Sequence, residues 1–454
     1  MIKVCKFGGS SLADAEKIRK VRDIVAADPD RRIVVVSAPG KRSGTDAKIT
    51  DLLIQCAEQA LNGESPEETL RTVVQRFAAI QTDLGLPDAV AAEIEKDLRA
   101  RLAGNFSHRA RFLDSLKAAG EDNGAKLMAA ALTQHGLPAR YVSPQEAGLL
   151  LSEEYGNAQL LPESYDNLAS LRESDAITVF PGFFGCTREG EIVTFPRGGS
   201  DITGSILAAA VKADLYENFT DIDSVCVIDP DLVENPEPIP HLTYREMREL
   251  SYAGFNVLHE EAIIPAVRAG IPICIKNTMA PDAPGTLITL ARKDVTGQPV
   301  GIAYTTGFMS ILLTKYLMNR EIGFGRKALQ IIEEEGIPFE HMPSGIDTLS
   351  VILRERDVDA QTEKKIIERM KDELNVSDFV VEHGLALIMV AGEGMVHHIG
   401  MAAKAAQALA DAGVNIEMLD QGASEISIMF GVKEEDAPRA VRSLYTAFFG
   451  TGKH

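Results

Sequence analysis

A chain of 454 residues is too long for one ordinary core, so we expect about two to four domains. Its 45% hydrophobic and 25% charged residues are typical of a soluble globular protein. The formal net charge of −20 argues against nucleic acid as a partner, because a protein that binds phosphate backbones needs a basic face.

The five cysteines lie far apart without CxxC spacing, which disfavours disulfides and a thiolate metal site and indicates a reducing cytoplasm. We expect no signal peptide, because Asp14 and Glu16 closely follow the first short apolar run. No apolar segment reaches the roughly 20 residues that span a bilayer, so no membrane partner is expected. The composition therefore predicts a cytoplasmic protein, and we assign no metal-ligating residues.

The first predicted strand, Ile2–Phe7, ends in Gly8-Gly9-Ser10-Ser11 and leads into an amphipathic helix. A strand that ends in small residues before a helix N-terminus exposes backbone N–H groups, which suits an anion. Lys6 can add a full positive charge to such a site. The pattern is neither GxxxxGK[ST] nor GxGxxG, so on these residues alone an ordinary strand–helix turn is an equal alternative.

The second predicted strand, Arg32–Ser37, is apolar almost throughout, as buried parallel strands are. A polar loop leads from it to a helix at Thr50–Leu61. Residues from about 65 to 119 have a helical pattern that opens with a capping box, Ser65–Glu68. Their many charged residues predict an exposed helical insert.

Gly120-Glu121-Asp122 ends this insert, and we expect a new helix from Ala125 to His135. Glu121 then stands near a helix start, where the helix dipole favours a carboxylate. A second glycine-rich helix start follows at Phe195–Ser205, after a strand at Ala176–Phe184. It repeats the arrangement of the first one.

Further strands and helices alternate up to about residue 290. The strands are expected at Tyr141–Val142, Leu215–Phe219, Ser224–Ile228 and Ile271–Lys276, and the helices at Ile206–Lys212, Tyr244–Ala253 and Glu260–Ala269. This alternation predicts an open, largely parallel α/β sheet sandwiched by helices.

The chain after Pro299 contains an internal repeat. Phe308–Leu353 aligns without a gap with Leu385–Phe430, at a constant offset of 77 residues that pairs Gly323 with Gly400 and Glu340 with Glu417. Each copy has the pattern strand, helix, strand, strand, and the second ends in a helix at Ala437–Phe449. We expect two ferredoxin-like modules in tandem, which serve more often as a sensor or an interface than as a second active site.

The two glycine-rich helix starts are explained best together, as a site for a nucleoside triphosphate. Phosphoryl transfer is catalysed mainly by positioning and charge neutralisation. Lys6 would meet the transferring phosphoryl group, and the N–H groups of Gly8, Gly9 and Ser10 would cradle the terminal phosphates. Asp201 could hold Lys6 by a charged hydrogen bond. Its alternative role is that of a helix-capping carboxylate.

Arg197 and Glu121 could recognise an amino acid. The guanidinium of Arg197, next to Gly198-Gly199-Ser200, suits bidentate binding of a carboxylate, although a surface ion pair is an equal alternative. Glu121 could pair with a substrate ammonium group. Together with the phosphate site, these residues predict a kinase that acts on a small zwitterion.

These residues lie in motifs that resemble those of the aspartokinase family. The motifs, in order, are Lys6–Ser11, Gly120-Glu121, Arg197–Asp201, Thr220-Asp221, Leu258-His259, Lys276–Thr278 and Pro284–Thr286, with Val414–Met418 and Gln421–Glu425 in the tail. The tail motifs are similar to those of the regulatory ACT modules. The resemblance covers almost the whole chain and is nearest to the lysine-sensitive branch.

The resemblance implies ATP-dependent phosphorylation of the β-carboxylate of L-aspartate, with Mg²⁺, to give 4-phospho-L-aspartate and ADP. This reaction opens the biosynthesis of lysine, threonine and methionine. The matching motifs imply the following roles: catalysis by Lys6 and Asp201; ATP binding by Lys6, Phe7, Gly8, Gly9, Ser10, Thr220, Asp221, Cys226 and Lys276; aspartate binding by Ser37, Thr50, Glu121, Arg197, Gly199 and Ser200. His259 is expected to be structural.

Some positions differ from the family's pattern. The loop between Ser37 and Thr50 is longer than usual, so Thr50 is assigned with less support, and the loop itself has no assigned role. Cys226 stands where tyrosine is frequent, and Asp231 stands where an arginine would supply a cation.

Two alternative functions stay open: an amino-acid kinase with another acceptor, and a catalytically silent amino-acid sensor.

The ACT resemblance also implies inhibition by an end product, lysine alone or together with threonine. Such coupling needs an effector that binds one of two arrangements better, typically by about 1–3 kcal/mol. The residues expected at the effector site are Met318, Gly323, Phe324, Glu340, Ser344 and Asp347. As alternatives, the apolar members pack a core and the acids are solvated. ACT modules usually pair across subunits, so we expect a homo-oligomer.

The expected domain limits follow from these assignments. They are 1–295 for the catalytic domain, 300–380 for the first module and 381–454 for the second, with strands that the modules could share.

Overall fold

The computed structural model describes residues 1–104, 107–196, 198–255, 257–258, 261–293 and 297–450. Contacts divide the chain into two compact units. The first comprises Met1–Val225, Pro238–Met247 and Asn256–Arg292, and the second comprises Cys226–Glu237, Arg248–Phe255 and Lys293–His454. The domain limits given above stay a prediction. Among the described residues, every helix is too short or too polar to span a bilayer.

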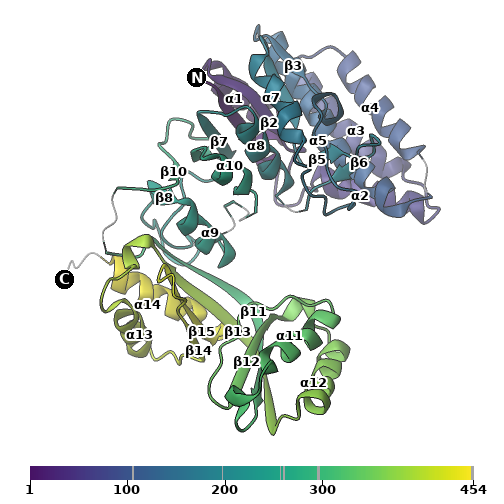
Figure 1. Cartoon of the computed structure of the whole chain (residues 1–454). Helices are drawn as coiled ribbons and strands as arrows, with labels where there is room; N and C mark the ends of the chain where they lie inside the picture. The colour runs from purple at the N-terminus through teal and green to yellow at the C-terminus, as the bar shows by residue number, and fades with distance from the viewer. Residues whose placement is uncertain (105–106, 197, 256, 259–260, 294–296, 451–454) are drawn as a thin grey trace. The chain divides into compact units, whose positions relative to one another are not determined.

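The first unit is built on an eight-stranded sheet (Figure 1). Its strands, in spatial order, are β3 (Ala139–Tyr141), β4 (Ile177–Pro181), β2 (Arg31–Val36), β1 (Lys3–Phe7), β7 (Leu215–Thr220), β9 (Ile273–Asn277), β10 (Thr286–Thr289) and β8 (His241–Thr243). Neighbouring strands run parallel except β9 and β10, which are antiparallel. The predicted open, largely parallel sheet is therefore confirmed.

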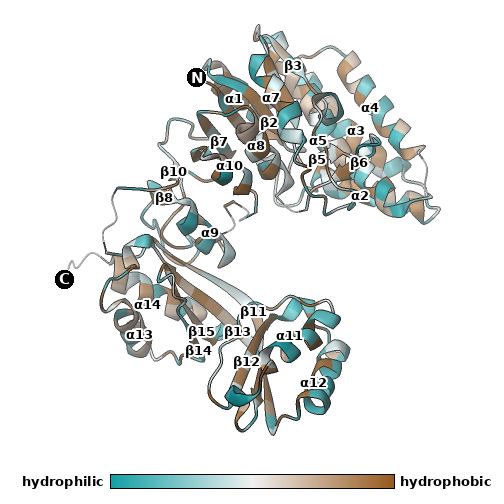
Figure 2. Ribbon diagram, viewed as in Figure 1, coloured by the Kyte–Doolittle hydropathy of each residue, from teal (hydrophilic) through white to brown (hydrophobic). Residues whose placement is uncertain are grey.

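Helices and a small hairpin surround this sheet. The helices are α1 (Ala15–Ala26), α2 (Ile49–Leu61), α3 (Glu67–Leu84), α4 (Ala89–Leu102), α5 (Arg109–Gln134), α6 (Pro144–Ala147), α7 (Ser164–Ala169), α8 (Gly199–Ala210) and α10 (Ile264–Ala269), and the hairpin pairs β5 (Phe184–Cys186) with β6 (Ile192–Thr194). Helix α9 (Tyr244–Tyr252) is divided between the two units after Met247. Figure 2 shows both hydrophobic and hydrophilic stretches along α3 and α4, as expected of amphipathic helices at a surface.

Strand β1 lies in the middle of the sheet, between β2 and β7, and its residues Val4, Cys5 and Phe7 are fully buried. A buried ion pair crosses the sheet beside it, with Arg31 Nε 2.7 Å from Glu217 Oε2. Cys5 Sγ also donates to that carboxylate. Burial raises the pKa of the Cys5 thiol well above its usual value, so this cysteine is an inert part of the core.

The expected break at Gly120 is wrong, because α5 runs through it as one helix of 26 residues. Gly120 packs so closely that an added Cβ would lie 2.7 Å from the Cβ of Ala38. The glycine therefore serves a close approach between helix and loop and does not mark a helix end. Glu121 lies in the middle of α5, where the expected help from the helix dipole does not apply.

Other boundaries differ from expectation by small amounts. Helix α3 begins at Glu67, after Pro66 as its N-cap residue, and that cap makes no side-chain hydrogen bond. Helix α8 begins at Gly199, well before the expected Ile206, because the glycine turn is itself its first turn. The expected strand at Ser224–Ile228 does not form.

The second unit holds one antiparallel sheet of five strands. In spatial order these are β12 (Thr348–Arg354), β11 (Gly301–Thr314), β13 (Asp378–Ala391), β15 (Ser427–Lys433) and β14 (Met418–Asp420), and the helices are α11 (Phe324–Glu334), α12 (Ala360–Leu374), α13 (Met401–Asp411) and α14 (Ala437–Phe449). The 14-residue strands β11 and β13 pair along most of their length, so both repeats share this sheet (Figure 1).

The two repeats are equivalent in local structure as well as in sequence. Gly323 and Gly400, 77 residues apart, both have positive φ angles, 81° and 94°, and both precede a helix of 11 residues. Only glycine adopts this backbone region without cost, which explains why it stands at both positions.

Candidate active site

The first glycine turn follows β1 directly. The N–H group of Gly8 donates to the carbonyl of Phe219 at 3.2 Å, and residues Gly9–Leu12 form a short 3₁₀ helix. An added Cβ on Gly9 would lie 2.8 Å from the carbonyl oxygen of Ala38. The turn therefore requires glycine, and its backbone lies against the loop that follows β2.

The second glycine turn opens α8. Gly198 has a φ angle of 79° and acts as the N-cap residue, and an added Cβ on Gly199 would lie 2.6 Å from the ring of Phe183. Ser200 is buried in the first turn of the helix. Arg197 lies outside the described residues.

A contact between Lys6 and Asp201 joins the two turns. Lys6 lies on β1 and is only 7% exposed, and its Nζ is 2.6 Å from Asp201 Oδ1 in the first turn of α8. The sequence predicted this contact from two motifs that are almost 200 residues apart. The turns at Gly8 and Gly198 thus lie on the same side of the first unit.

Asn218 is part of this site, although the sequence analysis did not identify it. It lies opposite Lys6 in the parallel register of β1 and β7, and its Nδ2 donates to Asp201 Oδ1 at 2.7 Å. Tyr216, two residues earlier on the same strand, donates its hydroxyl to the backbone oxygen of Asp201 at 3.2 Å. The sequence signal for Asn218 was weak, because it is one of two adjacent polar residues, Glu217 and Asn218, in a short buried strand.

One oxygen of the buried Glu121 carboxylate has no hydrogen-bond partner among the described residues. The residue is 6% exposed, and the oxygen without a partner is Oε2. Burial raises the pKa of Glu121 to about 8, against the opposing effect of hydrogen bonds from the backbone N–H groups of Ala38 and of Glu121 itself. A buried, unpaired carboxyl group is costly unless a cation or donor joins it, which fits an ammonium ligand.

The remaining residues expected to bind aspartate lie near the first turn. Ser37 donates its N–H group to the carbonyl of Phe7 at 3.2 Å, so it sits beside the end of β1. Thr50 is half-buried in the first turn of α2. The backbone of Ile49, just before it, donates to the carbonyl of Pro39.

The residues expected to bind nucleotide lie at the ends of β7 and β9. Thr220 ends β7, and its hydroxyl donates to Asp221 at 3.0 Å. The carbonyl of Thr220 accepts from the N–H group of Thr278, whose hydroxyl is 2.7 Å from that of Ser11. Lys276 lies on β9, in register with Phe219. Cys226 groups with the second unit, so its expected role stays a prediction.

Several residues of the expected effector site already pack in a core or form hydrogen bonds. Met318 and Phe324 belong to a hydrophobic cluster of the first repeat, as the alternative reading of their role had it. Arg354 Nε donates to Glu340 Oε1 at 2.6 Å, and the Tyr252 hydroxyl donates to the other oxygen. Asp347 Oδ1 accepts from the N–H group of Leu317 at 2.7 Å, whereas Ser344 forms a bridge with Leu349.

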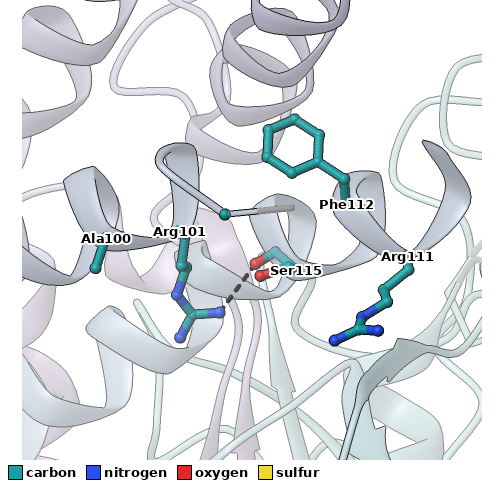
Figure 3. A pocket seen from close by; sticks show the side chains of 6 residues that line it. Ala100, Arg101, Arg111, Phe112 and Ser115 are labelled. Atoms are coloured by element: carbon teal, nitrogen blue, oxygen red, sulfur yellow. Dashed lines mark hydrogen bonds between the residues drawn. The ribbon is translucent and has the colours of Figure 1, made fainter. Parts of the chain in front are cut away.

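A separate pocket of about 330 Å³ lies between the end of α4 and the start of α5 (Figure 3). It is lined by Ala100, Arg101, Gly104, Arg111, Phe112 and Ser115. Arg101 donates to Asp97, Asp122 and the carbonyl of Ser115, and Arg111 pairs with Glu191. Since both guanidinium groups already have acidic partners, we assign this pocket no anionic ligand.

Comparison with known proteins agrees with this geometry. The amino acid kinase family matches residues 1–277, and an ACT domain matches residues 388–448. Aspartokinase 3 of Bacillus subtilis is 56% identical over 448 residues, which cover 99% of this chain and 99% of that protein.

Two solved aspartokinases have similar structures over almost their whole length. The aspartate kinase of Clostridium acetobutylicum has a TM-score of 0.83 and 38% identity, over 98% of this chain and 99% of that one. Aspartokinase III of E. coli in complex with aspartate and ADP (R-state) has a TM-score of 0.81 and 27% identity, over 99% and 100%. The same enzyme in complex with lysine and aspartate (T-state) has a TM-score of 0.79 and 26% identity, over 99% of each chain.

The position of Asn218 leads to a prediction. Asn218→Leu keeps the branched shape of the side chain but removes the donor to Asp201, and a hydrogen bond to a charged group contributes about 1.5–3 kcal/mol. We expect kcat for phosphoryl transfer to fall about tenfold. Tyr216→Phe is the matched control, because it removes a bond to the same residue's backbone and should change kcat less than about twofold. Equal kcat values for Asn218→Leu and the wild type, in steady-state assays, would contradict a role for Asn218.

Proposed function

The chain belongs to the aspartokinase family, within the amino acid kinase family, and from this premise we propose which residues carry its reaction. It is an ATP-dependent kinase that phosphorylates aspartate. We propose that Lys6 and Asp201 form the catalytic pair and that the β-carboxylate of aspartate accepts the phosphoryl group. The observation that carries this proposal is the 2.6 Å contact between Lys6 Nζ and Asp201 Oδ1, at the junction of two glycine turns.

The transferring phosphoryl group would lie between these turns. The N–H groups of Gly8, Gly9 and Ser10 would donate to the terminal phosphates of ATP, since no side chain at the glycines blocks them. Lys6 would place its positive charge on the oxygens that gain charge in the transition state. Asp201 would orient the ammonium group of Lys6. Phe7 would support the turn from the end of β1.

We propose that Mg²⁺ takes part in the reaction. Its chemistry there is to neutralise phosphate charge and to orient the phosphates. Among the described residues, no three potential ligands are grouped for a metal ion. Since Mg²⁺ keeps several waters and needs only one or two protein carboxylates, phosphate oxygens of ATP and water would supply its remaining ligands.

Aspartate would be held on the other side of the first turn. Glu121 would bind its ammonium group, because the buried carboxylate has an oxygen without a partner in the described structure. Arg197 would bind a substrate carboxylate, a proposal that rests on its motif. Ser37, Thr50, Gly199 and Ser200 would line the same site. The nucleotide would contact Thr220, Asp221 and Lys276, and Lys276 would lie near the adenine. A role for Cys226 rests on its motif alone.

Lys6→Ala tests the catalytic pair. We expect it to lower kcat by roughly a hundredfold or more, because it removes charge that is needed most in the transition state. The measurement is ADP release in a coupled assay with L-aspartate, and circular dichroism checks that the fold is intact. A folded variant with near-normal kcat would exclude Lys6 from the mechanism.

The pH dependence of aspartate binding tests Glu121. With a pKa of about 8, its carboxyl group is largely protonated at pH 7 and ionises as the pH rises, and only the ionised form pairs with an ammonium group. We therefore expect KM for aspartate to fall by a factor of roughly five to ten between about pH 7 and pH 8.5. Glu121→Gln should have a higher KM that stays flat over this range. The same pH profile in both proteins would assign the titration to another group.

We propose that lysine, alone or together with threonine, inhibits the enzyme through the ACT repeats and that these repeats pair in a homo-oligomer. The E. coli relative is known in complex with lysine and aspartate, which supports lysine as the first candidate. The effector would contact Met318, Gly323, Phe324, Glu340, Ser344 and Asp347. Glu340 would bind the effector ammonium group and would have to share its carboxylate with Arg354.

Glu340→Ala tests this effector site. We expect the concentration of lysine that halves the activity to rise at least about tenfold, because a charge-assisted hydrogen bond is lost, while turnover without lysine is unchanged. Tyr252→Phe is the control, since it removes a donor to Glu340 and keeps the carboxylate. Unchanged lysine inhibition in Glu340→Ala would contradict the assignment, and inhibition assays with threonine would then identify the effector.

A further inference from the structure

The loop between β2 and α2 is closed at both ends by one buried arginine. Arg76 lies on α3 and is 4% exposed. Its Nη2 donates to the carbonyl of Gly40 at 2.7 Å, and its Nη1 donates to the carbonyl of Ala47 at 2.8 Å. Asp46, within the loop, forms an ion pair with Arg76, and the distance between Asp46 Oδ2 and Arg76 Nη1 is 3.2 Å. A single guanidinium group therefore joins the start and the end of residues 40–47.

The start of this loop contacts both halves of the proposed active site. Gly40 donates its N–H group to the carbonyl of Gly9 at 2.8 Å, and an added Cβ on Gly40 would lie 2.6 Å from the carbonyl carbon of Gly9. Two residues earlier, Ala38 packs against α5 next to Glu121, where an added Cβ on Gly120 would lie 2.7 Å from the Cβ of Ala38. Residues 38–40 thus lie between the phosphate turn and the carboxylate proposed to bind the substrate ammonium.

The burial of Arg76 is costly. Its Nε atom has no hydrogen-bond partner among the described residues, and burial lowers the pKa of the guanidinium, against the effect of Asp46. Burying a charged group with one donor unsatisfied costs free energy that a well-packed apolar side chain would not cost. The two carbonyls it reaches lie seven residues apart, and the fork of two Nη atoms binds one carbonyl with each.

We infer that Arg76 is a positioning residue, which fixes residues 38–40 and thereby the spacing between the Gly8-Gly9 turn and Glu121. This inference rests on the roles proposed above for the turn and for Glu121. The loop itself would not touch the reacting atoms. Its tip, residues 41–45, is exposed, whereas its two ends are held.

A displacement of about 1 Å between groups that hold two substrates can lower the rate about a hundredfold. Loss of Arg76 should therefore affect both substrates at once. A purely structural arginine would affect the melting temperature and leave the kinetic constants of the folded enzyme unchanged. The kinetic constants thus separate the two roles.

The test compares Arg76→Met and Arg76→Lys with Arg71→Met, an exposed arginine on the same helix. In Arg76→Met we expect kcat/KM for aspartate and for ATP each to fall at least tenfold, measured by ADP release on the folded protein. Arg76→Lys should recover part of this loss, because a lysine retains the charge but reaches one carbonyl at most. Arg71→Met should match the wild type. Wild-type kcat/KM values in folded Arg76→Met would overturn the inference.

Gly40→Ala provides an independent test that leaves Arg76 in place. Its Cβ must push the backbone of Gly9 away, so we expect the same joint fall in kcat/KM. If Arg76→Met fails to fold, Gly40→Ala is the test of the inference. Wild-type kcat/KM values in Gly40→Ala would then overturn it. Glu121→Gln in the same assays separates the two proposals. If it leaves KM for aspartate unchanged, the proposed substrate site is wrong; if it raises KM while both loop variants behave as wild type, the loop inference alone fails.

Discussion

The pairing of β1 with β7 is the constraint on which the active site depends. Because Lys6 lies opposite Asn218 in that register, both side chains reach the same carboxylate oxygen of Asp201. Parallel strands place their carboxyl ends at one edge of a sheet, so the turns after these strands gather there. A shift of one residue would turn either side chain to the other face of the sheet. The buried pair of Arg31 and Glu217 joins β2 and β7, the strands on either side of β1, and so helps to hold this register.

Glu121 illustrates how a functional group is kept in an unfavourable state. The middle of α5 gives it no stabilisation from a helix end, and its surroundings leave one oxygen without a partner in the described structure. Gly120 beside it lets the backbone of residue 38 approach, which supplies one donor but no charge. The carboxyl group therefore gains most when a cation enters, and this difference between empty and occupied states favours binding of an ammonium group over a neutral ligand.

The sequence predicted those parts of the site that depend on local patterns. The glycine turns at Gly8 and Gly198, the contact of Lys6 with Asp201 and the repeat offset all follow from short motifs and residue types. The continuity of α5 was not predictable, because a glycine in a helical pattern often marks a helix end, whereas the close contact of Gly120 with Ala38 comes from tertiary packing. Asn218 and Arg76 were missed for a related reason. Their partners lie 17 or more residues away, and no periodicity marks a polar residue that bonds to a distant carboxylate or carbonyl.

The second unit imposes a different constraint, since both repeats share the strands β11 and β13. A change in the twist of either strand is transmitted within one sheet, so an effector bound at the first repeat would affect the second. Glu340 is bonded to Arg354 on β12 of this sheet. It is also bonded to Tyr252, in the segment Arg248–Phe255 of the same unit. An ammonium group that binds Glu340 would compete with these two donors for the lone pairs of one carboxylate. The differential free energy that regulation requires would then come from the exchange of partners around a single carboxylate.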